Sequence, residues 1–217
     1  ITAGHSDLAT EQDGIDFLQS RNCDALILHV EAVSDDYLLQ LAAGDTPFVL
    51  LNRHIPAIAD RCISLNNELG GYLATRHLLQ QGHRQIAYIA GPMWKTDARD
   101  RYHGHQRALA EYQLTADPAL FFEGDFRETG GSKGLESLLK TGKAFSALVC
   151  ANDEMASGAI TAARELGLNI PQQLSVMGYD NVNFAYYTYP KLSTIEYPIS
   201  AMGQMAARWV LREVYQQ

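Results

Sequence analysis

Polar side chains stand directly after several apolar segments of this sequence. Asn66 follows CISL, Asn152 follows ALVCA, and Asp180 follows SVMGY. In an open parallel sheet, ligands bind outside the carboxyl ends of the strands, so residues in these positions can converge on one site. Amides and carboxylates together offer the donors and acceptors that a hydroxyl-rich ligand needs. The alternative is that these residues only cap helices or form turns.

An arginine and two aromatic residues are candidates to complete such a site. Arg101 lies near the start of a helical segment, where its guanidinium can form paired hydrogen bonds with vicinal hydroxyls or with a carboxylate. Phe126 and Tyr197 can provide flat apolar walls. The simpler alternatives are a solvated surface arginine and aromatic residues of the core. We predict that Arg101, Asn152 and Asp180 surround one cavity suited to a neutral, hydroxyl-rich ligand.

Other kinds of site find little support. Neither a GxGxxG turn nor a GxxxxGK[ST] loop follows any apolar segment, and no nucleophile elbow is recognised. The seven histidines are scattered, so we predict no metal and no cofactor. Cys23, Cys62 and Cys150 stand in apolar surroundings and are expected to be reduced structural thiols. We therefore do not expect an enzyme, although an α/β enzyme acting on a sugar or a nucleotide is one alternative.

The elements that position these residues alternate in type along the chain. Apolar runs predict strands at residues 25–30, 48–51, 63–65, 86–90, 120–122, 147–151 and 174–179, and helical spacing predicts helices at residues 10–20, 35–43, 68–81, 97–112, 129–140 and 153–166. Continuous apolar strands that alternate with helices indicate a parallel sheet covered on both faces. The predicted fold class is α/β.

Composition limits the partners of the chain. The 217 residues contain 25 acidic and 17 basic residues, and the net charge of −8 disfavours direct binding to nucleic acid. No apolar run approaches the roughly 20 residues of a membrane span, and the first residues lack a basic and then apolar leader. We expect a cytoplasmic protein that does not enter a membrane.

Four longer strings occur in a familiar order and spacing: HLLQQGHRQIAYIAGP, RYHGHQRAL, FSALVCANDEMASGAITAARELGLNIPQQLSVMGYDN and YPKLSTIEYP. The chain resembles the LacI/GalR family of bacterial transcriptional repressors over almost its whole length. Within that family, RNCDALILHV and RCISLNNELGGYLATRHLLQQGH look most similar to the galactose-repressor branch.

The resemblance implies a fold similar to that of periplasmic binding proteins, with two doubly wound αβα lobes joined by crossover strands and a sugar held between the lobes. It places residues 1–82 and 196–217 in an incomplete N-terminal lobe and residues 83–195 in a C-terminal lobe, with the domain truncated at both ends. The site residues that it implies are a sugar-clamping Arg101, the hydroxyl ligands Asn152 and Asp180, a stacking Phe126, and Asn66 and Tyr197 close to the pocket.

The function implied by the resemblance is that of a sugar-binding and dimerisation core of a transcriptional regulator. A sugar effector, with a galactoside as one candidate, would alter operator binding by a homodimer whose helix-turn-helix is not part of these residues. The alternative from another class is a periplasmic sugar-binding protein that serves a transporter. The segment encoded before Ile1, either a helix-turn-helix or a signal peptide, would separate the two.

Overall fold

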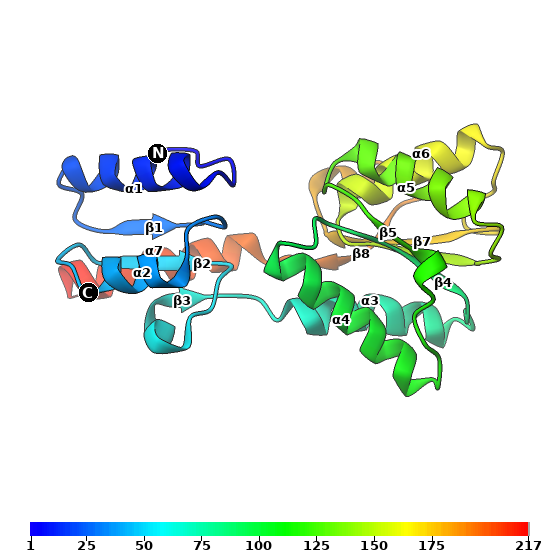
Figure 1. Cartoon of the computed structure of the whole chain (residues 1–217), viewed down its shortest axis with the longest axis horizontal. Helices are drawn as coiled ribbons and strands as arrows, with labels where there is room; N and C mark the ends of the chain where they lie inside the picture. The colour runs from blue at the N-terminus through cyan, green and yellow to red at the C-terminus, as the bar shows by residue number, and fades with distance from the viewer. Residues whose placement is uncertain (217) are drawn as a thin grey trace. The chain divides into compact units, whose positions relative to one another are not determined.

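The computed structural model describes residues 1–216, which form two compact units (Figure 1). Unit 1 contains residues 1–65 together with the C-terminal segment that begins at Pro198, and unit 2 contains residues 66–197. The chain therefore leaves unit 1 after Leu65 and returns to it after Tyr197. All six predicted site residues belong to unit 2.

Unit 1 is built on a three-stranded parallel sheet. Its elements are α1 (Leu8–Ser20), β1 (Leu26–Leu28), α2 (Asp35–Ala42), β2 (Phe48–Leu51), the 3-10 segment η1 (Pro56–Arg61), β3 (Cys62–Ile63) and α7 (Ile199–Tyr215). The strand order is β1-β2-β3. Each strand runs parallel to its neighbour, as the alternation of strands and helices predicts.

Successive residues of β2 face opposite sides of this sheet, as strand geometry requires. Phe48 packs in a buried cluster with Ile15 of α1 and Leu38 of α2. Val49 packs in a separate cluster with Trp209 of α7. Both faces of the central strand are thus covered by helices, which explains why its sequence is continuously apolar rather than alternating.

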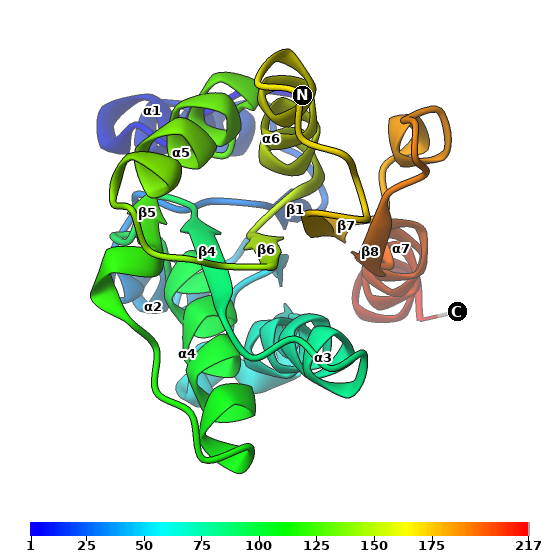
Figure 2. The same cartoon turned by 90° about the vertical axis from the view of Figure 1, so that its right-hand side faces the viewer.

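Unit 2 is built on a five-stranded parallel sheet. Its elements are α3 (Asn67–Gln80), β4 (Ile86–Ala90), α4 (Thr96–Glu111), η2 (Pro118–Leu120), β5 (Phe121–Glu123), α5 (Glu128–Lys140), β6 (Ala147–Cys150), α6 (Asp153–Glu165), β7 (Ser175–Asp180), η3 (Asn183–Tyr186) and β8 (Ser193–Glu196). The strand order is β5-β4-β6-β7-β8. Helices α3 and α4 lie on one face of the sheet, and α5 and α6 lie on the other (Figure 2).

Two of the three inner strands of this sheet, β4 and β6, are completely buried in the core of unit 2. Every residue of β4 and β6 is buried, because helices cover both sides of the strands. Leu79 of α3 and Leu138 of α5 belong to the same buried cluster as the strand residues. Burying an aliphatic side chain of this size contributes roughly 1.5–3 kcal/mol, so these contacts hold the helices on the sheet and fix the strand ends that follow.

Helices α3 and α4 meet through glycines. A Cβ atom on Gly71 would overlap the backbone of Arg101, and a Cβ atom on Gly104 would overlap the backbone of Glu68. Only residues without a side chain allow the two helix backbones to approach this closely. The contact holds Arg101 at a fixed position relative to the start of α3.

This packing decides to which unit α3 belongs. The sequence placed a division near Gly82–His83, so that residues 66–82 would lie in the first lobe, but the contacts of α3 join it to unit 2 and the division follows Leu65. The chain returns to unit 1 after Tyr197, two residues beyond the boundary at residue 195 that the resemblance implied. Backbone contact between helices is a tertiary property, and the periodicity of α3 alone does not show it.

The predicted fold class is confirmed, since both sheets are parallel and alternate with helices. The bounds of the six predicted helices differ from the observed ones by no more than two residues. Helix α7 was not predicted, and β8 was expected only as a crossover. Strand β8 lies at the edge of its sheet, and its sequence STIE has no continuous apolar run to identify it.

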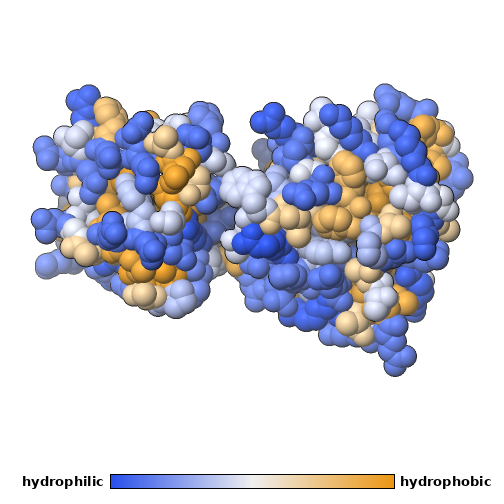
Figure 3. Space-filling model, viewed as in Figure 1, coloured by the Kyte–Doolittle hydropathy of each residue, from blue (hydrophilic) through white to orange (hydrophobic). Residues whose placement is uncertain are grey.

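The visible surface is largely hydrophilic, and the three cysteines are unpaired. Hydrophilic residues cover much of the face shown in Figure 3, with smaller apolar areas between them. Among residues 1–216, none of the helices combines the length and the apolar character needed to span a bilayer. Cys23, Cys62 and Cys150 are all free, and Cys150 is buried in β6.

Candidate functional site

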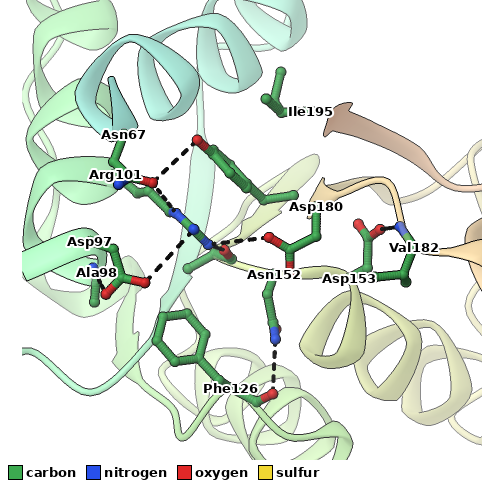
Figure 4. Close-up of polar contacts among 12 residues, drawn as sticks. Asn67, Asp97, Ala98, Arg101, Phe126, Asn152, Asp153, Asp180, Val182 and Ile195 are labelled. Atoms are coloured by element: carbon green, nitrogen blue, oxygen red, sulfur yellow. Dashed lines mark hydrogen bonds and ion pairs between the residues drawn. The ribbon is translucent and has the colours of Figure 1, made fainter. Parts of the chain in front are cut away.

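Arg101 lies at the centre of a polar cluster in unit 2 (Figure 4). It occupies the second turn of α4, and only 3% of the residue is exposed. Its Nε donates a hydrogen bond to Oδ1 of Asn67 at 3.0 Å, and its Nη1 donates to the backbone oxygen of Ala151 at 2.6 Å. These bonds tie α4 to the start of α3 and to the end of β6, so Arg101 is not the solvated residue of the simpler interpretation.

Two carboxylates and two aromatic rings surround the guanidinium. Nη2 lies 3.8 Å from Oδ2 of Asp97, and Nη1 lies 3.7 Å from Oδ1 of Asp180. The Cζ atom lies 3.8 Å from the ring centroid of Tyr179 and 5.8 Å from that of Phe126. Charge partners and ring faces compensate for the burial of the cation, which would otherwise carry a large desolvation cost.

Asn152 acts as the N-cap of α6. Its Oδ1 accepts a hydrogen bond from the backbone N–H of Met155 at 3.0 Å, and its Nδ2 donates to the backbone oxygen of Phe126 at 2.8 Å. The capping alternative therefore applies to this residue, and the amide also anchors the loop that carries Phe126. One N–H of the amide and its second acceptor lone pair remain for a further partner.

Asp180 is the last residue of β7 and has an unusual backbone. Its φ of 113° lies in a region that residues other than glycine rarely adopt. Burial raises the pKa of its carboxyl to about 7, and the carboxylates of Asp97, Asp153 and Glu154 act in the same direction. The guanidinium of Arg101 opposes this shift without cancelling it. Asp180 therefore titrates in the neutral range.

The stability of the protein is expected to depend on pH through Asp180. Its pKa is higher in the folded state, at about 7, than the ordinary value of 3.8, so the folded state binds the proton more tightly. This contribution to stability is complete below the ordinary pKa and is lost as the pH rises through the folded pKa. At a pH of about 8, Asp180→Asn is expected to raise the free energy of unfolding by about 1–3 kcal/mol.

Urea denaturation of both proteins at a pH of about 5 and a pH of about 8 checks this expectation. The increase in the free energy of unfolding caused by Asp180→Asn should be smaller at the lower pH, where the wild-type carboxyl is protonated. An equal effect at both pH values would contradict the assignment of a raised pKa to this residue.

Phe126 and Tyr197 lie at the same end of the sheet. The ring of Phe126 packs on Gly91 so closely that a Cβ atom there would overlap it. Tyr197 follows β8, and its backbone N–H donates to the backbone oxygen of Asp180 at 3.1 Å. Burial raises the pKa of the Tyr197 phenol to about 12, so the hydroxyl stays neutral. Phe126 and Tyr197 therefore both lie near the carboxyl ends of the strands.

Of the adjacent pair Asn66 and Asn67, the structure brings the second one to the cluster. Asn66 caps α3, and its Oδ1 accepts from the backbone N–H of Leu69 at 2.8 Å. Asn67 is buried and accepts hydrogen bonds from Arg101 at 3.0 Å and from the hydroxyl of Tyr179 at 3.4 Å. Strand-end position identified Asn66, but only the direction of the first helical turn decides which of the two adjacent amides faces inward.

Sequence reasoning missed two acidic residues of the cluster. Asp97 precedes Arg101 by four positions on α4, a spacing that signals an ion pair on a helix. Asp153 follows Asn152, the N-cap of α6, and is the first residue of that helix. The carboxylate of Asp153 accepts from the backbone N–H of Val182 at 2.9 Å and from Oγ1 of Thr194 at 2.6 Å. Asp153 therefore links the segment that follows β7 to the start of β8, and no local pattern indicated that role.

The groups best suited to catalysis or to metal binding are engaged elsewhere. Burial lowers the pKa of His105 to about 3, and its Nδ1 is 2.9 Å from Oγ1 of Thr75. Burial raises the pKa of the Cys150 thiol. Although no nucleophile elbow was expected, the string GGSKG at residues 130–134 has the spacing of that motif. It lies inside α5, where the hydroxyl of Ser132 donates to the backbone oxygen of Gly158, so it is not at a turn between a strand and a helix. In the described part of the chain, His, Cys, Asp and Glu side chains form no group of three suited to a metal ion.

Comparison with known proteins places this arrangement in a family. A family model of the periplasmic binding protein-like domain matches residues 75–217. The fold is similar to that of a sugar-binding transcriptional regulator of the LacI family from Escherichia coli complexed with phosphate, with a TM-score of 0.89 and 30% identity over 95% of this chain and 74% of that chain. This chain belongs to the LacI/GalR family. The resemblance seen in its motifs is thereby confirmed.

Other LacI/GalR proteins extend the comparison. The HTH-type transcriptional regulator GalR of Salmonella typhimurium is 38% identical over 211 residues, which are 97% of this chain and 62% of the relative. A LacI-family regulator from Enterococcus faecium with bound ribose has a TM-score of 0.82 and 31% identity over 94% of this chain and 75% of that chain. The chain thus spans about 62% of the length of the GalR relative.

Proposed function

We propose that this chain is the effector-binding core of a LacI/GalR-type transcriptional regulator, in which sugar binding changes the affinity of the whole protein for its operator DNA. The sugar binds at the cluster around Arg101, with Asn152 and Asp180 as partners for its hydroxyls and Phe126 against its ring. Tyr197 borders the same site, whereas Asn66 caps α3 and its neighbour Asn67 takes the place in the cluster. DNA is contacted through a helix-turn-helix outside these residues, and the protein acts in the cytoplasm as a homodimer.

The observation that carries this proposal is the convergence of a guanidinium, two carboxylates and two amides at the carboxyl ends of β6 and β7. Nη1 of Arg101 lies 3.7 Å from Oδ1 of Asp180, although 79 positions separate the two residues in the chain. Ligands of open parallel sheets bind at this edge, and mixed donors and acceptors beside an aromatic ring match a hydroxyl-rich ring. The ribose-bound relative and the E. coli sugar-binding regulator support the same class of ligand.

Sugar binding can regulate only through a difference in affinity. A ligand shifts an equilibrium between two conformations by no more than the ratio of its affinities for them. The bonds that Arg101 makes to α3, β6 and β7 couple the site to three elements of unit 2. A sugar that changes these bonds therefore acts on the packing of the unit as well as on the ligand pocket.

Isothermal titration calorimetry tests the proposed function. The purified chain is titrated with galactose, glucose, ribose and their methyl glycosides, and binding by at least one of them is expected. The full-length protein, incubated with that sugar, should then show a changed affinity for its operator in a fluorescence anisotropy assay. Binding of none of these sugars would contradict the proposal, and binding without any effect on operator affinity would reject the regulatory role.

Two rival functions differ in specific outcomes. A periplasmic sugar-binding protein would bind sugar equally well, but the transcriptional regulators among the relatives favour the regulatory role. A sugar-transforming enzyme would consume its ligand during the titration. Unchanged sugar after prolonged incubation, measured by NMR, is the expected result.

The homodimer is expected to use the exposed aromatic surface at residues 184–189 of unit 2. Tyr187 and Tyr189 are 85% and 83% exposed, and Phe184 and Tyr187 border a groove of about 370 Å³ together with Glu128 and Glu154. Exposed clusters of tyrosine are typical of protein interfaces, where buried tyrosines carry much of the binding energy. Tyr187→Glu is expected to weaken dimerisation at least tenfold, because it buries a charge in the interface.

Sedimentation velocity over a range of protein concentrations measures this effect. Leu139→Glu on α5 is a matched control, since it places the same charge on another exposed apolar residue of unit 2. The control should dimerise like the wild type. If both variants dimerise equally, the interface lies elsewhere.

A further inference from the structure

The positive charge of the Arg101 guanidinium is already balanced by neighbouring groups, so it attracts an anionic ligand only weakly. Its Nε and Nη1 already donate to Asn67 and to the backbone of Ala151. Its remaining donors are directed toward a region bordered by the carboxylates of Asp97 and Asp180, at 3.8 and 3.7 Å. One positive charge thus stands beside two negative ones. An arginine with free donors would attract a phosphate or a carboxylate, but this one is already balanced.

Of these three charged side chains, the carboxylate of Asp180 is the most accessible. The side chain of Asp180 is 27% exposed, compared with 16% for Asp97 and 4% for Arg101. A ligand that approaches the cluster from solvent therefore meets Asp180 before it meets the guanidinium. Figure 4 shows the two side chains pointing toward each other, with Asn152 beside them.

Charged and titratable groups from several elements face Asp180. Helix α4 contributes Arg101 and Asp97, α6 contributes Asp153 and Glu154, β7 contributes Tyr179, and the segment after β8 contributes Tyr197. Burial raises the pKa values of both phenols, so they remain neutral near pH 7. The carboxylates therefore outnumber the guanidinium. The ammonium of Lys95 is a second cation in this region, with its Nζ 5.7 Å from the ring centroid of Phe126.

We propose that Asp180 selects the charge of the effector: as a carboxylate it admits neutral sugars and excludes anionic ones, such as sugar phosphates and sugar acids, and it admits anionic sugars only when it is protonated. This inference rests on the proposed function and concerns the same site. A neutral hydroxyl can donate a hydrogen bond to the carboxylate, whereas a phosphate or carboxylate of the ligand meets like charge in a partly dehydrated site. Selectivity then comes from repulsion of the wrong ligand as well as from attraction of the right one.

Because Asp180 can be protonated, the selectivity between neutral and anionic sugars should depend on pH. Burial places its pKa at about 7, so that acidification through the neutral range removes the repelling charge and leaves Arg101 only partly balanced. Affinity for an anionic sugar should therefore rise as the pH falls. Neutral sugars lose only a charge-assisted hydrogen bond, so their affinity should change less or fall.

Calorimetry with matched ligands tests this inference in the purified chain. The probes are galactose with galacturonate and galactose 6-phosphate, and ribose with ribose 5-phosphate, each at a pH of about 8 and a pH of about 6. For the wild type at the higher pH, the neutral member of the pair that binds should bind at least tenfold more tightly than its anionic members. In Asp180→Asn at the higher pH this ratio should be at least tenfold lower than in the wild type, and the ratio measured for the variant should be the same at both pH values.

Glu196→Gln is the matched control. Glu196 pairs with Asp180 in the register of β7 and β8 and is exposed, so this variant removes the same charge from the neighbouring position. It should leave the ratio within about twofold of the wild type, because an exposed charge is screened by solvent. A ratio that falls equally in both variants would assign the effect to net charge and overturn the role of Asp180.

The outcomes separate this inference from the proposed function. Tight binding of an anionic sugar by the wild type at the higher pH would overturn the inference and leave the effector-binding function intact. A failure of Asp180→Asn to admit any anionic sugar would also overturn it, even if neutral sugars bind as expected. If no probe binds to either protein at either pH, both the inference and the proposed function are wrong.

Discussion

Replacing Arg101 with alanine is expected to abolish sugar binding and to lower the free energy of unfolding by about 3–5 kcal/mol. The change removes the donors that satisfy Asn67 and the backbone oxygen of Ala151, and both acceptors are buried. It also leaves the carboxylates of Asp97 and Asp180 without their shared cation. An unpaired buried polar group costs about 1–3 kcal/mol, so several together account for a loss of this size.

Urea denaturation followed by circular dichroism measures the stability, and calorimetry on the folded fraction measures the binding. Arg107→Ala is the matched control, because Arg107 lies on the same helix but is exposed, with an ion pair to Glu68 and a ring contact to Tyr72 at the surface. Its loss should cost no more than about 1 kcal/mol. Equal stability of the two variants would show that the buried bonds of Arg101 do not support the fold.

Arg101→Lys separates the two effects. Lysine keeps the positive charge near Asp97 and Asp180 but cannot donate to Asn67 and Ala151 from one planar group. We expect stability between those of the wild type and the alanine variant, together with weakened sugar binding. Unchanged sugar affinity in this variant would show that the planar guanidinium of Arg101 does not bind the sugar.

Replacing Gly71 with alanine is expected to destabilise the protein by about 3 kcal/mol, at the upper end of the range for overpacked interiors. The added methyl group would overlap the backbone oxygen, carbonyl carbon and Cα of Arg101. A flexible side chain could move aside, but the backbone of a neighbouring helix cannot do so without shifting α4. The change therefore also displaces Arg101 and should weaken sugar binding, although Gly71 itself makes no polar contact with the cluster.

Gly203→Ala provides the opposite control. Gly203 lies in α7, and a Cβ atom there would meet no atom within 4 Å. Because alanine favours helix more than glycine does, this variant should be more stable than the wild type by up to about 1 kcal/mol. Thermal denaturation of the two variants gives the comparison. If Gly71→Ala proves as stable as Gly203→Ala, the close packing of α3 on α4 is not needed for the fold.

Several features of the site could be predicted because short stretches of the sequence determine them. Strands β4 and β6 are continuously apolar because helices cover both of their faces, and that requirement leaves its pattern in each strand separately. A polar residue after such a strand lies at the carboxyl edge of the sheet, which is why Asn152 and Asp180 could be chosen. Arg101 was chosen because a helix start follows the same edge.

Other features depended on residues far apart in the chain. The partners of Arg101 at Asn67 and Ala151 are 34 and 50 positions away, and no local spacing indicates such bonds. Backbone contact at Gly71 assigned α3 to unit 2, against the expected division near residues 82–83. Helix α7 joins the sheet of unit 1 after the chain has passed through all of unit 2.

Local patterns therefore established the family, the order of strands and helices, and the edge of the sheet at which polar residues gather. The spacing of apolar residues along an element reflects which side of that element is buried, so burial can be inferred from the sequence. Whether Arg101 is exposed or held by buried bonds, whether Asn66 or Asn67 faces the cluster, and the pKa at which Asp180 titrates depend on folding. Each of these is set by the burial and charge that distant residues create around one atom, and only the packed chain brings those residues together.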